Sequence, residues 1–269
     1  MNKILKSNQL ASRVQRLLSA VLVLFFLAAC VSTSAPGSSV TNRPVTDKAM
    51  VHTKLAQSYL QQKQYATAKE ELEKALKIDP RHSESNYVMA LLMMELQQFE
   101  ATEEHFKKAI KFDDGSNSAA AHDFGTYLCQ TGRERDAVKY FDIAANNPLF
   151  DQPHLSYMRA GECLSKISDP NAEKYLQRAL TIDPRLGPAL FQLAKIKYTN
   201  NENLSARAYI QRYIAINKKQ PAALFLAYKI ESTLNANEYA NEYRSQLLED
   251  FPASSEARVV RDQMPADRE

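Results

Sequence analysis

A unit of about 34 residues recurs six times between Ala49 and Ser254, and this repeat restricts the possible folds more than any other feature of the chain. Two copies end in nearly the same way, with LKIDP at residues 76–80 and LTIDP at residues 180–184. Each copy has the apolar spacing of two amphipathic helices. Only six glycines occur among the 269 residues, which favours helix throughout. The repeat therefore predicts an all-α solenoid of stacked helical pairs.

The copies resemble tetratricopeptide repeats, in which small residues allow the two helices of a unit to cross closely. The first unit has Ala56, Ala68 and Ala75 at such positions, and Pro80 ends its second helix because proline cannot donate the next hydrogen bond. We expect a superhelical solenoid of six helix-turn-helix units. They span residues 49–82, 83–117, 118–152, 153–186, 187–220 and 221–254, and residues 255–269 form a capping helix and tail in which Val259 and Val260 cover the last apolar face.

The first 29 residues have the layout of a secretory signal peptide. A basic region without acidic residues precedes an apolar run from Leu17 to Ala29 that is interrupted only by Ser19. These 13 residues are too few to cross a bilayer, which takes roughly 20. The predicted signal peptide therefore covers residues 1–29.

The apolar run ends in LAAC at residues 27–30, which resembles the cleavage box of bacterial lipoproteins. That resemblance implies that Cys30 becomes the first mature residue and carries a lipid anchor. Val31, in place of Asp, resembles the pattern of export to the outer membrane. Residues 30–48 are rich in Ser, Thr and Pro and are predicted to be a flexible tether. The alternative is an ordinary cleaved signal followed by an unrelated cysteine.

Removal of the signal changes the charge balance of the chain. The whole sequence has 34 basic against 31 acidic residues, and the mature chain has 30 against 31. The apparent basicity belongs to the signal peptide, so nothing in the composition favours a nucleic-acid partner.

Two cysteines remain after Cys30, and they lie one repeat apart. Cys129 and Cys163 both belong to first helices, in adjacent units. Neighbouring first helices pack side by side, so the two residues can approach the roughly 5.5 Å Cα separation that a disulfide needs. An oxidising periplasm would support the bond. The alternative is a pair of buried thiols that act as small apolar residues.

A catalytic or metal site is not indicated. The five histidines do not form a metal-binding spacing such as H-E-x-x-H, and there is no glycine-rich phosphate loop. Glu103-Glu104-His105 and His122-Asp123 have acid/base residues together, but a solvated charge run on a repeat helix explains them better. We therefore predict no enzyme activity, no cofactor and no small-molecule substrate.

The first helices of the units supply the inward-facing positions of the repeat and are predicted to line a protein-binding groove. In the first two units these positions include apolar and aromatic residues, namely Met50, Leu60, Tyr87, Leu91 and Met94. Exposed apolar side chains in a groove suit protein partners, and methionine adapts to varied surfaces. The third and fourth units instead offer His122, Thr126 and Glu162. The alternative is that the apolar side chains only pack between neighbouring helices.

Together, the lipoprotein box, the tether and six units resemble the PilF/PilW family of type IV pilus biogenesis lipoproteins, the pilotins of the pilus secretin. The resemblance is strongest at GTYLCQ (125–130), NPL (147–149), GEC (161–163), ARAYIQRY (206–213), and FP (251–252) with SEAR (255–258). It implies a disulfide between Cys129 and Cys163.

The resemblance also implies a function and a location. It implies that the chain is anchored on the periplasmic side of the outer membrane, binds subunits of the type IV pilus secretin, and promotes their localisation and multimerisation. The alternative is a general periplasmic adaptor with the same fold that scaffolds other envelope proteins, such as cell-wall hydrolases.

Overall fold

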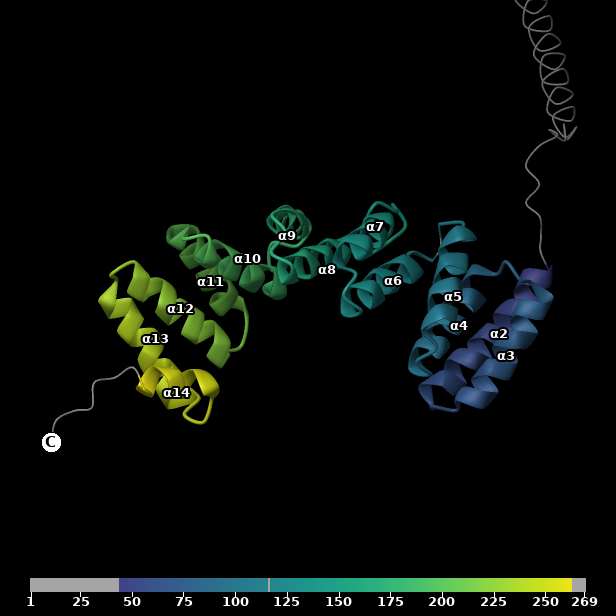
Figure 1. Cartoon of the computed structure of the whole chain (residues 1–269), viewed down its shortest axis with the longest axis horizontal. Coiled ribbons are helices and arrows are strands. Elements are labelled where there is room, and N and C mark those ends of the chain that lie inside the picture. Colours follow the sequence, from purple (N-terminus) through teal and green to yellow (C-terminus); the bar gives the residue numbers. More distant parts are fainter. Residues whose placement is uncertain (1–43, 116, 263–269) are drawn as a thin grey trace, which may run out of the picture. The chain divides into compact units, whose positions relative to one another are not determined.

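The structure is a computed structural model that describes residues 44–115 and 117–262. Those ranges contain 13 α-helices and no strand (Figure 1). The prediction of an all-α repeat fold is therefore confirmed. The predicted signal peptide, Cys30, residues 30–43 of the predicted tether and the last seven residues lie outside the described ranges. Residues 44–48, which are predicted to end the flexible tether, instead begin the first described helix, so that boundary is wrong.

Twelve of these helices form six pairs that follow one another along the chain. The first helices of the pairs are α2 (Pro44–Gln61), α4 (Ser83–Glu95), α6 (Ser118–Gln130), α8 (Pro153–Lys166), α10 (Gly187–Thr199) and α12 (Pro221–Thr233). The second helices are α3 (Tyr65–Ile78), α5 (Phe99–Lys111), α7 (Glu134–Ala145), α9 (Asn171–Ile182), α11 (Asn203–Ile216) and α13 (Asn237–Asp250). From α4 onward, each first helix begins at the first residue of a unit expected from the sequence.

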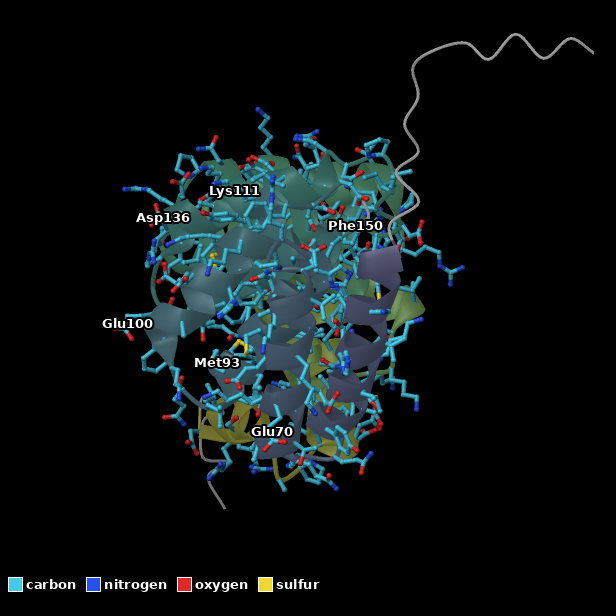
Figure 2. The ribbon with its side chains drawn as sticks, turned by 90° about the vertical axis from the view of Figure 1, so that its right-hand side faces the viewer. Glu70, Met93, Glu100, Lys111, Asp136 and Phe150 are labelled. Atoms are coloured by element: carbon cyan, nitrogen blue, oxygen red, sulfur yellow. A yellow bond between two sulfur atoms is a disulfide. The ribbon has the colours of Figure 1, made fainter. Side chains whose placement is uncertain are left out.

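Within a pair, one large side chain of the second helix fills the space left by a small residue of the first. The large residues of the first five pairs are at most 1% exposed and are Leu72, Phe106, Phe141, Leu176 and Ile210. The small residues, one on each first helix, are Ala56, Ala90, Gly125, Gly161 and Ala194. Charged side chains of the second helices, such as those of Glu100 and Asp136, point outward (Figure 2).

In the fourth pair the two helices approach each other closely at Gly161. A Cβ atom at Gly161 would lie 2.6 Å from Leu176 Cγ and 3.0 Å from the Ala172 carbonyl oxygen. At Gly125, in the third pair, the corresponding distances are 3.0 Å to Phe141 Cδ1 and 3.1 Å to the Ala137 carbonyl oxygen. Glycine is therefore required at these positions because it lacks a Cβ atom, not because of an unusual backbone conformation.

The same turn joins the two helices of every pair. Its middle residue has a positive φ, between 52° and 80°, and is Lys63, Gln97, Gly132, Ser168, Asn201 or Asn235. The amide after it bonds to a carbonyl five residues back, as from Gln98 to Met93. This bond is typical of a Schellman ending, in which glycine is usual. Only one of the six turns has glycine there, so the turns were not evident from composition.

A final helix, α14 (Ser255–Asp262), covers the end of the sixth pair. Ala257 and Val260 are buried and pack with Leu224 and Leu247. Val259 is 42% exposed, so the expectation that it covers this face together with Val260 is wrong. The physical reason is helical spacing: residues three apart share a face, whereas adjacent residues do not.

Gly161→Ala tests the close crossing in the fourth pair. We expect the free energy of unfolding to fall by about 2 kcal/mol, because the new methyl group would overlap Leu176 and force the helices apart. Urea unfolding followed by circular dichroism measures the change. Gly125→Ala should cost less, since its new methyl group meets Phe141 at a longer distance. A Gly161→Ala chain as stable as wild type would contradict this account of the pair.

Candidate functional site

The five residues predicted to line a groove lie on the first helices of pairs one and two. Met50 and Leu60 belong to α2, and Tyr87, Leu91 and Met94 belong to α4. All five side chains are half-buried. Each of them therefore keeps part of its surface available to a partner.

The buried part of these side chains supports two core clusters. Leu60 packs against the cluster that contains Leu72 and Leu92. Leu91 and Met94 pack against the next cluster, which is built around Phe106 and other aromatic rings. The same residues therefore pack between neighbouring helices and remain accessible to a partner.

Tyr87 is held by a contact between the second and third units. Its hydroxyl donates a hydrogen bond to Asp123 Oδ2 at 2.7 Å. Burial, and after it the Asp123 carboxylate, raises the pKa of the Tyr87 phenol above its ordinary value. This bond fixes the ring beside Leu91. Sequence reasoning missed it, although Tyr87 and Asp123 occupy nearly equivalent places on consecutive first helices.

Polar side chains connect the first two units beside the apolar residues. Thr53 Oγ1 lies 2.6 Å from Ser85 Oγ, which lies 2.6 Å from His82 Nδ1. Gln57 donates to Glu84 Oε1 at 2.8 Å. Burial raises the pKa of Glu84, and the bond from Gln57 opposes that shift. The apolar residues of units one and two therefore lie beside a set of bonded polar side chains that includes the carboxylate of Glu84.

In the third unit the corresponding face is polar and internally bonded. His122 Nδ1 lies 2.8 Å from Ser156 Oγ of the fourth unit. The His122 ring lies between Phe141 and Phe150, with centroid distances of 5.7 and 6.1 Å. Burial lowers the pKa of His122 and favours the neutral ring. Thr126 Oγ1 donates to the His122 carbonyl oxygen of its own helix.

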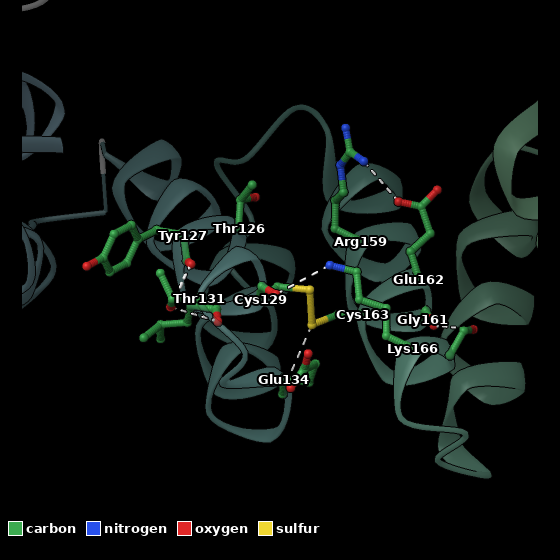
Figure 3. Close-up of a disulfide and its surroundings, with 12 residues drawn as sticks. Thr126, Tyr127, Cys129, Thr131, Glu134, Arg159, Gly161, Glu162, Cys163 and Lys166 are labelled. Atoms are coloured by element: carbon green, nitrogen blue, oxygen red, sulfur yellow. Dashed lines mark hydrogen bonds and ion pairs between the residues drawn. A yellow bond between two sulfur atoms is a disulfide. The ribbon is translucent and has the colours of Figure 1, made fainter. Parts of the chain in front are cut away.

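A disulfide joins Cys129 of α6 to Cys163 of α8, with a Cα–Cα distance of 5.8 Å (Figure 3). The Cys163 side chain is fully buried, and Lys166 donates to the Cys129 carbonyl oxygen at 3.3 Å. In the same region Arg159 forms an ion pair with Glu162, at 2.9 Å. The bond thus connects the first helices of the third and fourth units directly.

The acidic and histidine cluster at residues 103–105 is divided among ion pairs and hydrogen bonds. Glu103 pairs with Lys107 and Arg133, and Glu104 pairs with Lys108. His105 Nδ1 instead faces Asn86 Oδ1 at 3.1 Å. The three side chains thus contact different residues and do not converge on one site. This agrees with the interpretation of the segment as a solvated charge run.

Within residues 44–115 and 117–262, no group of three or more His, Cys, Asp or Glu side chains is arranged to hold a metal ion. In the same part of the chain, every helix is too short or too polar to span a bilayer.

The first helices of units five and six carry a second group of residues that the sequence analysis missed. It consists of Phe191, Lys195, Tyr198, Phe225 and Lys229. The inward-facing positions that yielded Tyr87, Leu91 and Met94 in the second unit yield these residues too. Applying the same spacing to the later units would therefore have found them.

Comparison with known proteins supports the repeat assignment and identifies relatives. A tetratricopeptide repeat profile matches residues 59–123. An uncharacterised protein of Haemophilus influenzae is 33% identical over 137 residues, which cover 51% of this chain and 73% of that protein. The type IV pilus assembly protein PilF of Pseudomonas aeruginosa is 21% identical over 182 residues, or 67% of this chain and 72% of PilF.

One solved structure is similar over nearly its entire length to this chain. The crystal structure of PilW, described as a widely conserved type IV pilus biogenesis factor, superposes with a TM-score of 0.62 and 29% identity. The match covers 79% of this chain and 97% of PilW.

Loss of the disulfide is expected to destabilise the third and fourth units. The bond closes a sequence separation of 34 residues, so Cys129→Ala/Cys163→Ala should lower the free energy of unfolding by about 3–4 kcal/mol in the chain-entropy view. Urea unfolding with and without dithiothreitol measures the effect, and reduced wild type is the matched control. Two free thiols in unreduced protein, with stability unaffected by dithiothreitol, would contradict the bond.

Partial burial favours the neutral form of His122, and this predicts a loss of stability at acidic pH. Its pKa is lowered in the folded chain, so below about pH 6.5 the unfolded chain binds more protons. Above that pH, His122 does not reduce the free energy of unfolding. As the pH falls below it, the free energy of unfolding decreases. Urea midpoints at neutral and acidic pH should therefore differ less in His122→Gln than in wild type. An equal difference in both chains would show that His122 does not contribute.

Proposed function

We propose that this chain, which has the tetratricopeptide-repeat fold and is similar to the type IV pilus biogenesis factors PilF and PilW, is a pilotin. In this role it binds subunits of the type IV pilus secretin and promotes their localisation and multimerisation in the outer membrane. The observation that carries the proposal is the match to 97% of PilW at 29% identity.

The proposed anchor is a lipid on Cys30, attached to the inner leaflet of the outer membrane. An anchored adaptor confines its bound partner to the membrane surface, so the effective concentration of secretin subunits there rises without any new contact. The role needs binding and confinement rather than catalysis, and a tetratricopeptide scaffold is suited to both.

The proposed binding face is the apolar part of α2 and α4. Leu60, Leu91 and Met94 each combine a packed side with an accessible side. Such half-buried side chains are held in place before binding, which lowers the entropic cost of ordering them in a complex. Tyr87 adds a ring whose position is set by Asp123. A secretin segment with apolar side chains is the partner that this face suits.

Leu91→Asp tests the face directly. We expect the affinity for purified secretin to fall at least about tenfold, because a carboxylate would be placed against the apolar partner. Fluorescence anisotropy with labelled secretin measures the affinity, and circular dichroism checks that helicity is kept. The matched control is Leu204→Asp, the same change at a leucine of α11 that is 69% exposed and lies on a second helix.

Two outcomes would count against the proposal. If Leu91→Asp keeps its helicity and binds secretin as well as Leu204→Asp, this face is not the binding site. If deletion of the gene leaves secretin multimers and surface pili unchanged, the chain is not a pilotin. A general adaptor for other envelope proteins would then explain the fold.

A further inference from the structure

The first helices of units five and six present aromatic rings alternating with lysines. Phe191, Lys195 and Tyr198 follow one another on α10 at helical spacing, and Phe225 and Lys229 repeat the first two positions on α12. We call these five residues the aromatic–lysine row. Positions that are apolar in the second unit, such as Leu91, are cationic here.

The rings of the row are fixed by the core but not fully covered. Phe191 and Tyr198 pack at the edge of the cluster formed by the third to sixth units, and Phe191 lies 5.2 Å from the Tyr213 ring. Phe225 packs at the edge of the last cluster, beside Tyr228. All three rings of the row are half-buried, so each has surface left for a ligand.

The two lysines contact rings instead of carboxylates. Lys229 Nζ lies 4.9 Å from the Tyr198 ring centroid and 5.5 Å from that of Phe225, and it thereby connects α10 with α12. Lys195 Nζ lies 6.0 Å from the Phe191 centroid, and its side chain is exposed. Neither ammonium group forms an ion pair with the described residues, whereas nearby Lys197 pairs with both Glu173 and Glu202. The row therefore has two ammonium groups that form no ion pair among the described residues.

A cavity of about 380 Å³ adjoins the row at Lys195. Hydroxyl and amide side chains supply much of its wall, from Ser165, Ser168, Gln192, Thr199 and Asn200. Its acidic residues, Asp169 and Glu173, are already paired with Arg135 and Lys197. Uncharged polar groups of this kind can bond to the main chain of a peptide, which carries both donors and acceptors.

We propose that the aromatic–lysine row and this cavity form a second docking surface, whose ligand is an extended peptide that carries both acidic and apolar side chains. Its carboxylates pair with Lys195 and Lys229, and its apolar side chains lie against Phe191, Tyr198 and Phe225. The polar wall of the cavity bonds to the peptide main chain. This surface is separate from the face on α2 and α4 and does not depend on secretin as the partner.

Charge complementarity distinguishes the two faces. Glu84 and Asp123 accompany the apolar face of the early units, so an acidic peptide is repelled there. The aromatic–lysine row on α10 and α12 contains Lys195 and Lys229 and no acidic residue. One chain can thus hold two segments of different charge at once.

The experiment uses the full chain in detergent micelles and a fluorescein-labelled peptide of repeated Ser-Glu-Leu units. A counterpart with Gln in place of Glu is the neutral probe. We expect the acidic peptide to bind more tightly than the neutral one, and Lys195→Met/Lys229→Met to weaken its binding about tenfold or more. Methionine keeps the length and apolar character of the lysine stem. The matched control is Lys174→Met/Lys218→Met, which removes the same charge from two exposed lysines outside the row.

Three outcomes would overturn the proposal. The acidic peptide binds no better than the neutral one, the row variant binds it as tightly as the control variant, or the row variant loses binding to anionic vesicles but not to the peptide. In the last case a membrane surface occupies the row. Leu91→Asp should leave peptide binding intact, so this test and the secretin test can fail independently.

Discussion

The close crossing of two helices within each pair is the contact on which the rest of the structure depends. A small residue on the first helix allows a large side chain of the second, such as Phe106 or Leu176, to be fully buried. This packing buries one face of each first helix. Another face of the same helix contacts the neighbouring units and keeps some accessible surface. The sixth pair departs from this arrangement, because Tyr228 stands where the other units have Ala or Gly. There α14 supplies the additional cover through Ala257 and Val260.

Stacking of one pair on the next relies on a different kind of contact. Specific polar or covalent links join first helices of consecutive units, from Tyr87 to Asp123, from His122 to Ser156 and from Cys129 to Cys163. Further along, Arg207 donates to Glu231, a carboxylate only 1% exposed, at 2.9 Å from Nε. A buried charge left without its partner is costly, so this pair also restricts how the last two units can stack. Solenoid stability is a sum over such neighbouring interfaces.

The sequence was sufficient for the fold because the relevant spacing is local. Small and large residues recur within each unit, so the helix starts at Ser83, Ser118 and Pro153 coincide with the expected unit starts. The turns were less evident, since residues such as Lys63 and Gln97 adopt a positive φ without being glycine. For the candidate site, sequence identified the helices that carry Leu60, Leu91 and Met94. It could not show how much of each side chain is covered, because that depends on a neighbouring unit.

The two first-helix faces suggest why a solenoid of six units is useful for a small adaptor. Core packing holds the rings and apolar side chains of both faces in place, so each face is preorganised without a loop that must close. The faces differ mainly in charge, with Glu84 and Asp123 at one and Lys195 and Lys229 at the other. Substitutions at these positions leave the small and large residues of the crossing untouched. If both proposed faces bind, their choice of partner is therefore expected to depend on these charged side chains, and it can differ along the chain while the fold stays the same.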